Sequence, residues 1–580
     1  MEHYSEMPPM PDVVYKTAKT GNMHHGSTWI GGEVPAHHAS IVINPGHTVT
    51  VTKSVTICGL AIHEGGALLL SPKHTIEFNN CGNVYKYGTI ISHPLSGIFH
   101  TFRFKHVDES KFVGGGMDIT ESDVGYWVRG KGKFDFVGPY RTPWVRLEAG
   151  VAVGEKIITL NQNPVGWKVG DVLSIVPTKK GDITGFEERS IVRISGNKVT
   201  LNAPLDFDHP VVKNPFTGQL HTAEVINTTR NIIIEGTPGG HTHINIMGTE
   251  FQTFENVRQQ YMGVRDVLGR YPNHLHHHKG GAVYKNVIIL DSDNRGFVSH
   301  TSHNILYEGC VTLRTKKDPY WWDEPTGRFD RSNDSNNITW LNCIAADLRW
   351  NTTEESHQLS GFVFGAGKDN KCIGCVVVGN RGRSSSAGGT WRSSANYAPF
   401  NVWVVLDFLS HNNYACGFRN WQNDPAKHEV SHFVIYHCQI GIESGAYGNA
   451  YEWNHGHIFE CDTAIEIHAL AISKGGATDE WGYISHFNKI LSTDPLRIMP
   501  HVLPGKPILV RESVFSSVIV DELSKSTAES EPGLFDFVNC EIGNYDVRGI
   551  AAGSAIRAQQ KGKAFQLTIK GIESIPPFAK

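Results

Sequence analysis

Residues 308–312 read EGCVT, and this short strand-like segment centred on a cysteine recurs along the second half of the chain. Each cysteine is followed by small or apolar residues and then by a polar or glycine-containing loop. The spacings between successive cysteines are 33, 32, 63, 23 and 79 residues. They suit coils of roughly 20 to 30 residues with inserted loops, which predicts a parallel β-helix. The other copies are LNCIA (341–345), IGCVV (373–377), YHCQI (436–440), FECDT (459–463) and VNCEI (538–542).

The recurring cysteines are either disulfide partners or small apolar residues of the core. Ten cysteines in 580 residues are sparse for a disulfide framework, and regular recurrence along a solenoid favours stacked, buried thiols. We therefore predict that these cysteines point inward at equivalent positions of successive coils. The prediction covers Cys310, Cys343, Cys375, Cys438 and Cys461.

The composition indicates a globular, all-β chain. Glycine, at 60 of 580 residues, exceeds the average of about 7% and occurs beside Val, Ile, Thr and Asn, which is typical of turn-rich β structure. Charged residues make up 19% and hydrophobic residues 40%, which excludes disorder and coiled coil for the bulk. The net charge of -4 provides no overall field for nucleic acid or an anionic membrane, and no apolar stretch reaches the roughly 18 residues of a membrane span.

Changes in pattern along the chain predict five segments. Short alternating apolar runs punctuated by glycines indicate strands with tight turns in the first half, and the cysteine pattern marks the solenoid. No signal peptide is visible at the start, and the compartment and oligomeric state stay open. The segments are a flexible leader (1–25), an eight-glycine-type β domain (26–135), a second β segment (136–225), the parallel β-helix (226–545) and a C-terminal tail (546–580).

Two pairs of histidines are the main candidates for a functional site in the solenoid. His241 and His243 lie two residues apart, as do His274 and His276, so on strands each pair points to one face. The pairs are offset by 33 residues, a plausible coil length, so four imidazoles are predicted to converge. Neutral imidazole suits zinc, iron, copper or nickel better than calcium, which predicts a divalent metal site. The chain holds 31 histidines, so one such pair also arises by coincidence, and the matched offset is what favours a site.

A long polar segment, 316–336, carries groups suited to a saccharide. Long loops on a solenoid are usually functional, aromatic rings stack on sugars, and guanidinium groups bind carboxylate or sulfate. The alternative is a loop that caps a coil end, with its adjacent acids merely solvated. The candidates are Tyr320, Trp321 and Trp322 for sugar stacking, Arg328 for an anionic group, and Asp323 or Glu324 as proton donor.

Several motifs occur in the order typical of one known family. They begin with TWIGGEVP (28–35) and GLAIHEGGAL (59–68), and continue with RNIIIEG (230–236), GRYPNHLH (269–276) and WWDEPTG (321–327). The sequence resembles the eight-glycine-domain family of the cell-migration-inducing hyaluronan-binding protein and the transmembrane hyaluronidase. The RYP-x-H-x-H motif is the most distinctive element, and weaker likeness extends to about residue 470, so roughly three quarters of the chain is covered.

The resemblance implies a right-handed parallel β-helix preceded by an N-terminal β domain, and a calcium-dependent endo-depolymerase of hyaluronan. Two departures leave another polysaccharide open as substrate. Leu275 stands where the family motif has phenylalanine, and the acids read Asp-Glu-Pro (323–325) where Glu-Asp-Gly is expected. The residues on motif positions are His241, Arg270, His274, His276, His300, Asp323 and Glu324.

Together these features predict a glycosaminoglycan-like endo-depolymerase with a metal-assisted groove on the solenoid. Arg270 is expected to grip a substrate carboxylate, and His300 to act beside the two acids. The metal is calcium by resemblance, or zinc or a similar ion by ligand type. Two alternatives stay open: a uronate lyase, and a non-catalytic glycan-binding β-helical protein of an extracellular surface or a virion.

Overall fold

The structure is a computed structural model of the chain. No helix among the described residues is both long enough and apolar enough to span a membrane. The described residues are 14–115, 118–322, 334–349, 359–365, 367–382, 386–391, 403–420, 428–445, 451–468, 485–499, 507–520, 534–547, 555–560 and 563–564.

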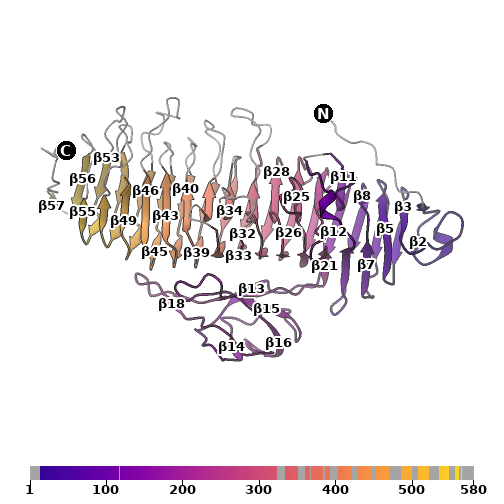
Figure 1. The fold of residues 1–580 in the computed structure, drawn as a ribbon, viewed down its shortest axis with the longest axis horizontal. Coiled ribbons are helices and arrows are strands. Elements are labelled where there is room, and N and C mark those ends of the chain that lie inside the picture. Colours follow the sequence, from indigo (N-terminus) through magenta and orange to yellow (C-terminus); the bar gives the residue numbers. More distant parts are fainter. Residues whose placement is uncertain are drawn as a thin grey trace.

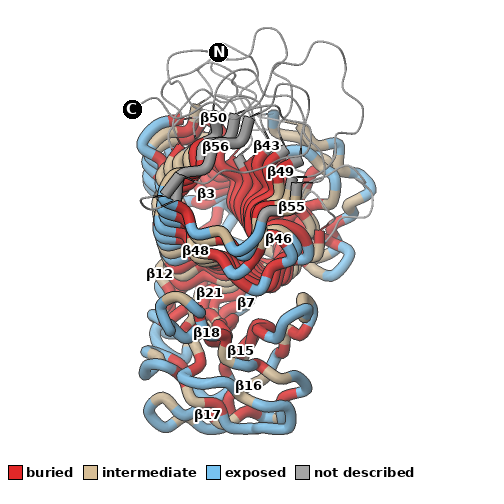
Figure 2. The backbone as a smooth tube through the Cα atoms, turned by 90° about the vertical axis from the view of Figure 1, so that its left-hand side faces the viewer, coloured by how far each residue is buried: buried red, intermediate tan, exposed pale blue. Residues whose placement is uncertain are grey.

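The chain winds into a long parallel β-helix, as predicted, with one smaller unit attached to its side (Figure 1). Most coils contribute three short strands, and strands in equivalent positions pair in parallel to form three faces. We call these the first, second and third faces, in the order in which the chain passes through a coil. Seen along the axis, buried residues line the inside of the coils, and exposed residues lie mainly on the outside (Figure 2). The inside is filled by one continuous apolar cluster, because alternate residues of every strand point inward.

The first and second faces form one large parallel sheet, and the two faces are continuous in the earliest coils. The early strands are β1 (Val14–Lys16), β3 (Ala39–Ile43) and β5 (Val55–Ile62). The first face continues with β7 (Ile76–Asn80), β10 (His100–Phe104), β21 (Ile232–Glu235), β24 (Val257–Gln260), β27 (Ile288–Leu290), β30 (Val311–Leu313), β33 (Ile344–Leu348), β36 (Val376–Asn380), β39 (Leu409–His411), β42 (Val434–Tyr436), β45 (His457–Phe459), β48 (Leu491–Ser492), β51 (Val514–Phe515) and β54 (Glu541–Ile542).

The second face carries the histidine motifs. Its strands are β8 (Val84–Lys86), β11 (Tyr126–Gly130), β22 (Ile244–Gly248), β25 (Asn273–His276), β28 (Phe297–His300), β31 (Tyr320–Trp322), β34 (Ser360–Phe364), β37 (Ala387–Trp391), β40 (Cys416–Asn420), β43 (Ile440–Gly445), β46 (Thr463–His468), β49 (Leu496–Met499), β52 (Val518–Val520) and β55 (Tyr545–Val547).

The third face forms the other solenoid sheet, and its outward residues are at least partly exposed in strands such as β26 and β29. Its strands are β2 (Gly21–Asn22), β4 (Thr48–Val51), β6 (Ala67–Leu70), β9 (Thr89–Ser92), β12 (Lys133–Val137), β23 (Gln252–Glu255), β26 (Ala282–Lys285), β29 (Ile305–Glu308), β32 (Ile338–Leu341), β35 (Asn370–Ile373), β38 (Trp403–Leu406), β41 (His428–Ser431), β44 (Tyr451–Asn454), β47 (Ser485–Asn488), β50 (Pro507–Arg511), β53 (Leu534–Val538) and β56 (Ala555–Gln560), with β57 (Lys563–Ala564) antiparallel to β56. Two short 3₁₀ helices, η1 (Gly26–Thr28) and η2 (Glu109–Lys111), lie in loops.

The N-terminal stretch belongs to the solenoid. Strand β1, inside the predicted leader, pairs with β3, so the expectation of a flexible segment fails from Val14 onward. Strand β10, inside the predicted eight-glycine-type domain, pairs with both β7 and β21. The predicted β structure of 26–135 is therefore present as coils of the same solenoid, because these strands stack directly on those that follow.

Residues 144–227 interrupt the solenoid between β12 and β21, and we call them the insert domain. Six of its strands form an antiparallel sheet whose apolar side packs on outward residues of the first face, including Ile288, Val311 and Ile344 (Figure 1). The sequence indicated a second β segment over 136–225 without placing it against the solenoid. The strands are β13 (Trp144–Arg146), β14 (Ile157–Thr159), β15 (Val172–Ile175), β16 (Glu187–Ser195), β17 (Lys198–Leu201), β18 (Val212–Lys213), β19 (Leu220–His221) and β20 (Glu224–Asn227).

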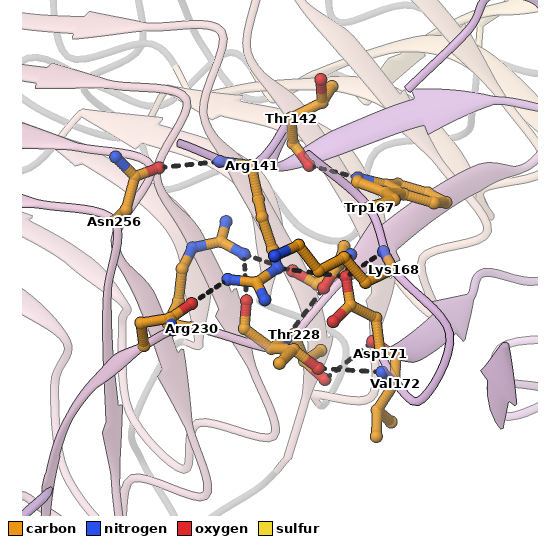
Figure 3. A network of polar contacts seen from close by, with 12 residues as sticks. Arg141, Thr142, Trp167, Lys168, Asp171, Val172, Thr228, Arg230 and Asn256 are labelled. Carbon is orange, nitrogen blue, oxygen red and sulfur yellow. Dashed lines mark hydrogen bonds and ion pairs between the residues drawn. The ribbon is translucent and has the colours of Figure 1, made fainter. Parts of the chain in front are cut away.

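A buried polar network fastens the insert domain to the solenoid (Figure 3). The carboxylate of Asp171 accepts hydrogen bonds from Arg141 Nε at 3.1 Å and from Asn227 Nδ2 at 2.8 Å. Arg230 donates to the backbone carbonyl oxygens of Asn227, at 3.0 Å, and Asn286, at 2.9 Å. Because Asn286 lies in a solenoid corner, these bonds join the two units directly.

Eight cysteines are buried thiols, and they include the five that were predicted to pack in the core. Cys310, Cys343 and Cys375 occupy equivalent positions, each following a corner residue that leads into the first face. Cys438 and Cys461 follow a different corner, at the end of that face, so the prediction of a single column is wrong for these two. The reason is that coil length varies, and a local cysteine pattern does not specify which corner it follows.

Candidate functional site

The second face brings histidines from neighbouring coils together. In the register of β22, β25 and β28, His274 lies opposite Asn245 and Val298, and His276 lies opposite His300. Leu275 belongs to the inner core, so the histidines on either side of it point outward. Outward imidazoles thus stack along the solenoid axis.

Four imidazoles, those of His274, His276, His277 and His300, form what we call the histidine cluster. The rings of His276 and His300 are stacked with centroids 4.5 Å apart, and the ring of His277 lies 4.9 Å from that of His276. Ring nitrogens of His276, His277 and His300 all lie within 4.8 Å of one another. His276 and His300 are only 6% and 8% exposed, whereas His277 is partly exposed and opens the cluster to solvent.

A short relay of hydrogen bonds orients the cluster. His274 Nδ1 lies 2.9 Å from the Gly269 carbonyl oxygen, so this nitrogen carries the proton. His274 Nε2 then accepts a hydrogen bond from His276 Nδ1, at 3.0 Å. This arrangement assigns the lone pair of His276 to Nε2, the nitrogen suited to bind a metal. Asn245 Nδ2 lies 3.4 Å from His274 Nδ1, and a hydrogen bond there would need the other tautomer of His274. We assign the tautomer from the shorter contact, the one to Gly269.

The cluster fits a divalent metal by the type and separation of its donors. Three imidazoles within 4.8 Å of one another are a typical ligand set for zinc and related ions, whereas calcium requires oxygen ligands. Burial and the neighbouring His300 lower the pKa of His277, which favours the neutral form that binds metals. His274 is placed to orient His276 through its hydrogen bond.

His241 and His243 do not join this cluster. The coil that separates the two motifs is 29 residues long in register, since Asn245 pairs with His274, and the expected offset of 33 is therefore wrong. His243 lies within hydrogen-bonding distance of the Asp123 carbonyl oxygen, at 3.1 Å, and packs on the Trp127 ring. Burial, reinforced by nearby Arg270, holds the pKa of His243 well below its ordinary value.

His241 lies instead between two carboxylates. Its Nδ1 is 2.7 Å from Glu109 Oε1, and its Nε2 is 3.8 Å from Asp293 Oδ1, which in turn pairs with Lys316 at 2.7 Å. Burial tends to raise the pKa of Glu109, but hydrogen bonds from His241 hold it below its ordinary value. This chain of charges links four loops beside the second face.

Arg270 is a buried structural cation. Its side chain has no exposed surface, and it donates to Asp123 Oδ2 at 2.6 Å, Gly115 O at 3.0 Å and Thr120 Oγ1 at 3.2 Å. The guanidinium also lies 4.6 Å from the Trp127 ring centroid. The predicted grip on a substrate carboxylate is not supported, because the guanidinium is fully buried and three of its N–H groups already donate to protein acceptors.

The predicted sugar platforms are largely part of the core. Tyr320 points inward, stacks on Phe362 with centroids 4.3 Å apart and donates its hydroxyl to the Cys310 carbonyl oxygen. Trp322 is buried, and only Trp321 belongs to an outward cluster. The proposed proton donors Asp323 and Glu324, together with Arg328, lie outside the described residues.

Sequence reasoning missed a stacked cation beside the histidine cluster. The Arg295 guanidinium lies 3.7 Å from the Trp321 ring centroid, and its Nη1 donates to the Tyr271 hydroxyl at 3.0 Å. Tyr271 in turn packs on His274 with ring centroids 4.9 Å apart. Arg295 precedes the FVSH motif (297–300) by two residues, and its position in a short polar loop gave no signal by itself.

No family model matches the sequence. The chain is similar to G8-domain proteins of Dictyostelium discoideum. It is 28% identical over 198 residues to one G8 domain-containing protein, covering 32% of this chain and 16% of that protein. It is 25% identical over 316 residues to communication mutant protein F, covering 50% of this chain and 26% of the relative. The chain thus spans about a quarter or less of the length of these two relatives.

Solved structures with a similar trace share little sequence with this chain. The tailspike gp49 of Pseudomonas phage LKA1 aligns over 90% of this chain and 70% of its own, with 10% identity and a TM-score of 0.22. The catalytic domain of a GH87 α-1,3-glucanase aligns over 69% of this chain and 89% of its own, with 7% identity and a TM-score of 0.30. These values are too low to support an inference about activity.

Proposed function

We propose that this protein binds an extended anionic polysaccharide along the second face and cleaves it internally with the help of a divalent metal. The histidine cluster carries the proposal, because it gathers metal-type ligands on an outward face of the solenoid. Parallel strands are spaced about 4.8 Å apart, so groups on successive coils form a ladder along which a linear polymer can lie. An extracellular location suits such a substrate.

Each residue of the cluster receives a distinct role in this proposal. His276, His277 and His300 hold the metal, and His274 orients His276. Bound there, a zinc-like ion supplies Lewis acidity and lowers the pKa of a coordinated water. Asp323 or Glu324 remains the proposed proton donor, since the two acids follow Trp322 in the sequence and Trp322 pairs with Ser299, next to His300.

Arg295 replaces Arg270 as the proposed cation for a substrate carboxylate. Its planar guanidinium is held by Trp321 and Tyr271 beside the cluster, and a guanidinium can bind a carboxylate through two parallel hydrogen bonds. We expect Arg295→Lys to lose activity on uronate polymers while neutral polysaccharides, if they bind, are unaffected.

The deciding experiment is incubation with a panel of glycosaminoglycans and bacterial capsular polysaccharides, with and without a chelator, followed by sizing of the products. The proposal expects shortened chains that disappear when the chelator is present. Products with unsaturated, ultraviolet-absorbing ends would favour a uronate lyase. Retention of full-length polymer on the protein, with no shortening, would favour a non-catalytic glycan-binding protein.

Metal content tests the ligand set separately from activity. The purified protein is expected to hold about one divalent ion, and the double variant His276→Ala/His300→Ala to lose it while the far-ultraviolet circular dichroism of the β-helix persists. His274→Ala removes only an orienting hydrogen bond and should weaken metal affinity about 10- to 100-fold. His25→Ala, at an exposed histidine, is the matched control. Full metal content in the double variant would refute the site.

A further inference from the structure

Two of the ten cysteines differ from the rest. Cys58 and Cys81 form a disulfide between neighbouring coils and are only partly buried, whereas the other eight are free and buried. Thiols sealed in the core are inert, but sulfur atoms near solvent can exchange with other thiols. Cys58 and Cys81 are therefore the sulfur atoms of this chain best placed for chemistry.

The pairing register brings a histidine to the same corner. Ala39 of β3 pairs with Ile57 of β5, which pairs in turn with Asn80 of β7. His38 precedes Ala39, Cys58 follows Ile57 and Cys81 follows Asn80, so the three residues come from successive coils. The solenoid itself thus positions all three side chains.

The imidazole of His38 faces both sulfur atoms. Its Nδ1 lies 3.5 Å from Cys58 Sγ and 3.8 Å from Cys81 Sγ, and the three ligand atoms lie within 4.8 Å of one another. His38 is exposed and adopts a left-handed backbone conformation, with φ of 65°. A disulfide that served only as a staple would not need this imidazole.

We propose that His38, Cys58 and Cys81 form a redox-gated site for a thiophilic divalent cation such as Zn²⁺. In the oxidised state the two sulfur atoms are joined and the coils are cross-linked. In the reduced state two thiolates and one imidazole offer three ligands, a recurrent zinc ligand set that leaves a fourth position for water. The site lies in the early coils and is separate in sequence and register from the histidine cluster.

The gating reaction is a thiol–disulfide exchange. A dithiol reductant attacks one sulfur atom, breaks the Cys58–Cys81 bond through a mixed disulfide and leaves as its own disulfide. Two electrons and two protons are thereby transferred to Cys58 and Cys81 as thiols. Metal binding then releases the two thiol protons to solvent, so reduction and metal uptake are coupled.

The test is cobalt binding by the folded protein before and after reduction. The protein is treated with dithiothreitol without denaturant, freed of reductant by gel filtration under argon, and titrated with Co²⁺. We expect about one equivalent to bind with the near-ultraviolet absorption of a thiolate-to-cobalt charge transfer, which a site of histidines alone does not give. The oxidised protein should not show this band.

Variants identify the ligands. Cys58→Ser and Cys81→Ser should abolish the band, and His38→Ala, which keeps both thiols, should weaken cobalt affinity at least tenfold, about 1.4 kcal/mol. His37→Ala, at the neighbouring exposed histidine, should bind as the parent does. A reduced parent protein without the band, or a Cys58→Ser variant that retains it, would overturn the proposal, as would a disulfide that native-state dithiothreitol leaves intact.

Discussion

At the scale of the residue, buried ion pairs distinguish structural residues from candidate ligands around the histidine cluster. The guanidinium of Arg270 donates to Asp123 and to two further acceptors, so it holds Gly115, Thr120 and Asp123 against the second face. The same carboxylate of Asp123 also accepts hydrogen bonds from the backbone amides of Val113 and Gly114, both at 2.9 Å. At the scale of the residue, the RYP motif therefore contributes an anchor at its arginine and metal-type ligands at its histidines.

Replacing Asp123 with alanine should strongly destabilise the protein. The side chains of Asp123 and Arg270 are both fully buried, and removal of one partner leaves an uncompensated charge. We expect a loss of about 3–5 kcal/mol in the free energy of unfolding, measured by urea denaturation. Glu77→Ala breaks an exposed pair with Arg103 and should change stability by less than about 1 kcal/mol. Equal effects of the two variants would contradict the structural role of Arg270.

Buried neutral histidines should make the fold acid-sensitive. Burial lowers the pKa of His100, His221 and His278 to about 4 each, below the ordinary value of 6.5. Between pH 6.5 and 4 the unfolded chain binds protons that the folded chain does not, so stability is complete above pH 6.5 and falls as pH approaches 4.

The variant His100→Asn tests this pH dependence. His100 lies 2.8 Å from Ser92 Oγ and 3.0 Å from the Ser71 carbonyl oxygen, contacts that an amide can partly replace without titrating. Relative to the parent, the variant should lose up to about 2 kcal/mol less stability between pH 7 and pH 5 in urea denaturation. The exposed variant His25→Asn should follow the parent, and a His100→Asn curve parallel to the parent's would rule out His100 as a contributor.

At the scale of the element, the corners of the coils set the register. The corner between the third and first faces holds a residue with positive φ in successive coils, whatever its side chain. Each coil thus turns through a left-handed residue, the conformation that glycine and asparagine tolerate best. The residues are Asn256, Asn286, Gly309, Asn342, Gly374, Asp407, His432, His455, Lys489, Glu512 and Asn539.

Asp407 is a suitable corner for measuring this strain. Its side chain is exposed, and its φ is 52°, so the backbone dominates the effect of substitution. Asp407→Gly should stabilise the protein by about 1 kcal/mol, and Asp407→Val should destabilise it by about 1–2 kcal/mol, both measured by thermal or urea unfolding. The reverse order of the two variants would show that the corner does not require a left-handed residue.

The corners also explain which features of the fold and of the candidate site can be predicted from the sequence. Recurring strands with a cysteine after Gly309, Asn342 and Gly374 predict the solenoid and its buried thiols, because each signal is local to one corner. The offset of His241 from His274 is not local, because it depends on how many residues the intervening loop adds to a coil. For the same reason the sequence does not indicate a role for Arg295. Its stacking on Trp321 arises only when neighbouring coils are in register.

At the scale of the whole molecule, the insert domain covers one of the three faces of the solenoid. Its apolar side covers much of the first face, whereas the histidine cluster lies on the second face, outside this contact (Figure 1). The docking is secured by buried charge as well as apolar contact. Glu224 of β20 pairs with Arg146 at 2.9 Å and lies 3.3 Å from His411 of β39, and the balance of these contacts against burial lowers the pKa of Glu224 to about 2.

Breaking the buried polar network around Asp171 should destabilise the insert domain before the solenoid (Figure 3). The side chains of Asp171 and Arg141 are each 4% exposed, so Asp171→Ala leaves a buried guanidinium without its anion and should cost about 3–5 kcal/mol. Because the solenoid coils keep their own core, hydrogen exchange should accelerate first in residues 144–227 and only later in the strands of the second face. Lys179→Ala, which breaks an exposed pair with Asp208, is the matched control and should change neither stability beyond about 1 kcal/mol nor exchange. Uniform acceleration over the whole chain would mean that insert domain and solenoid unfold as one cooperative unit.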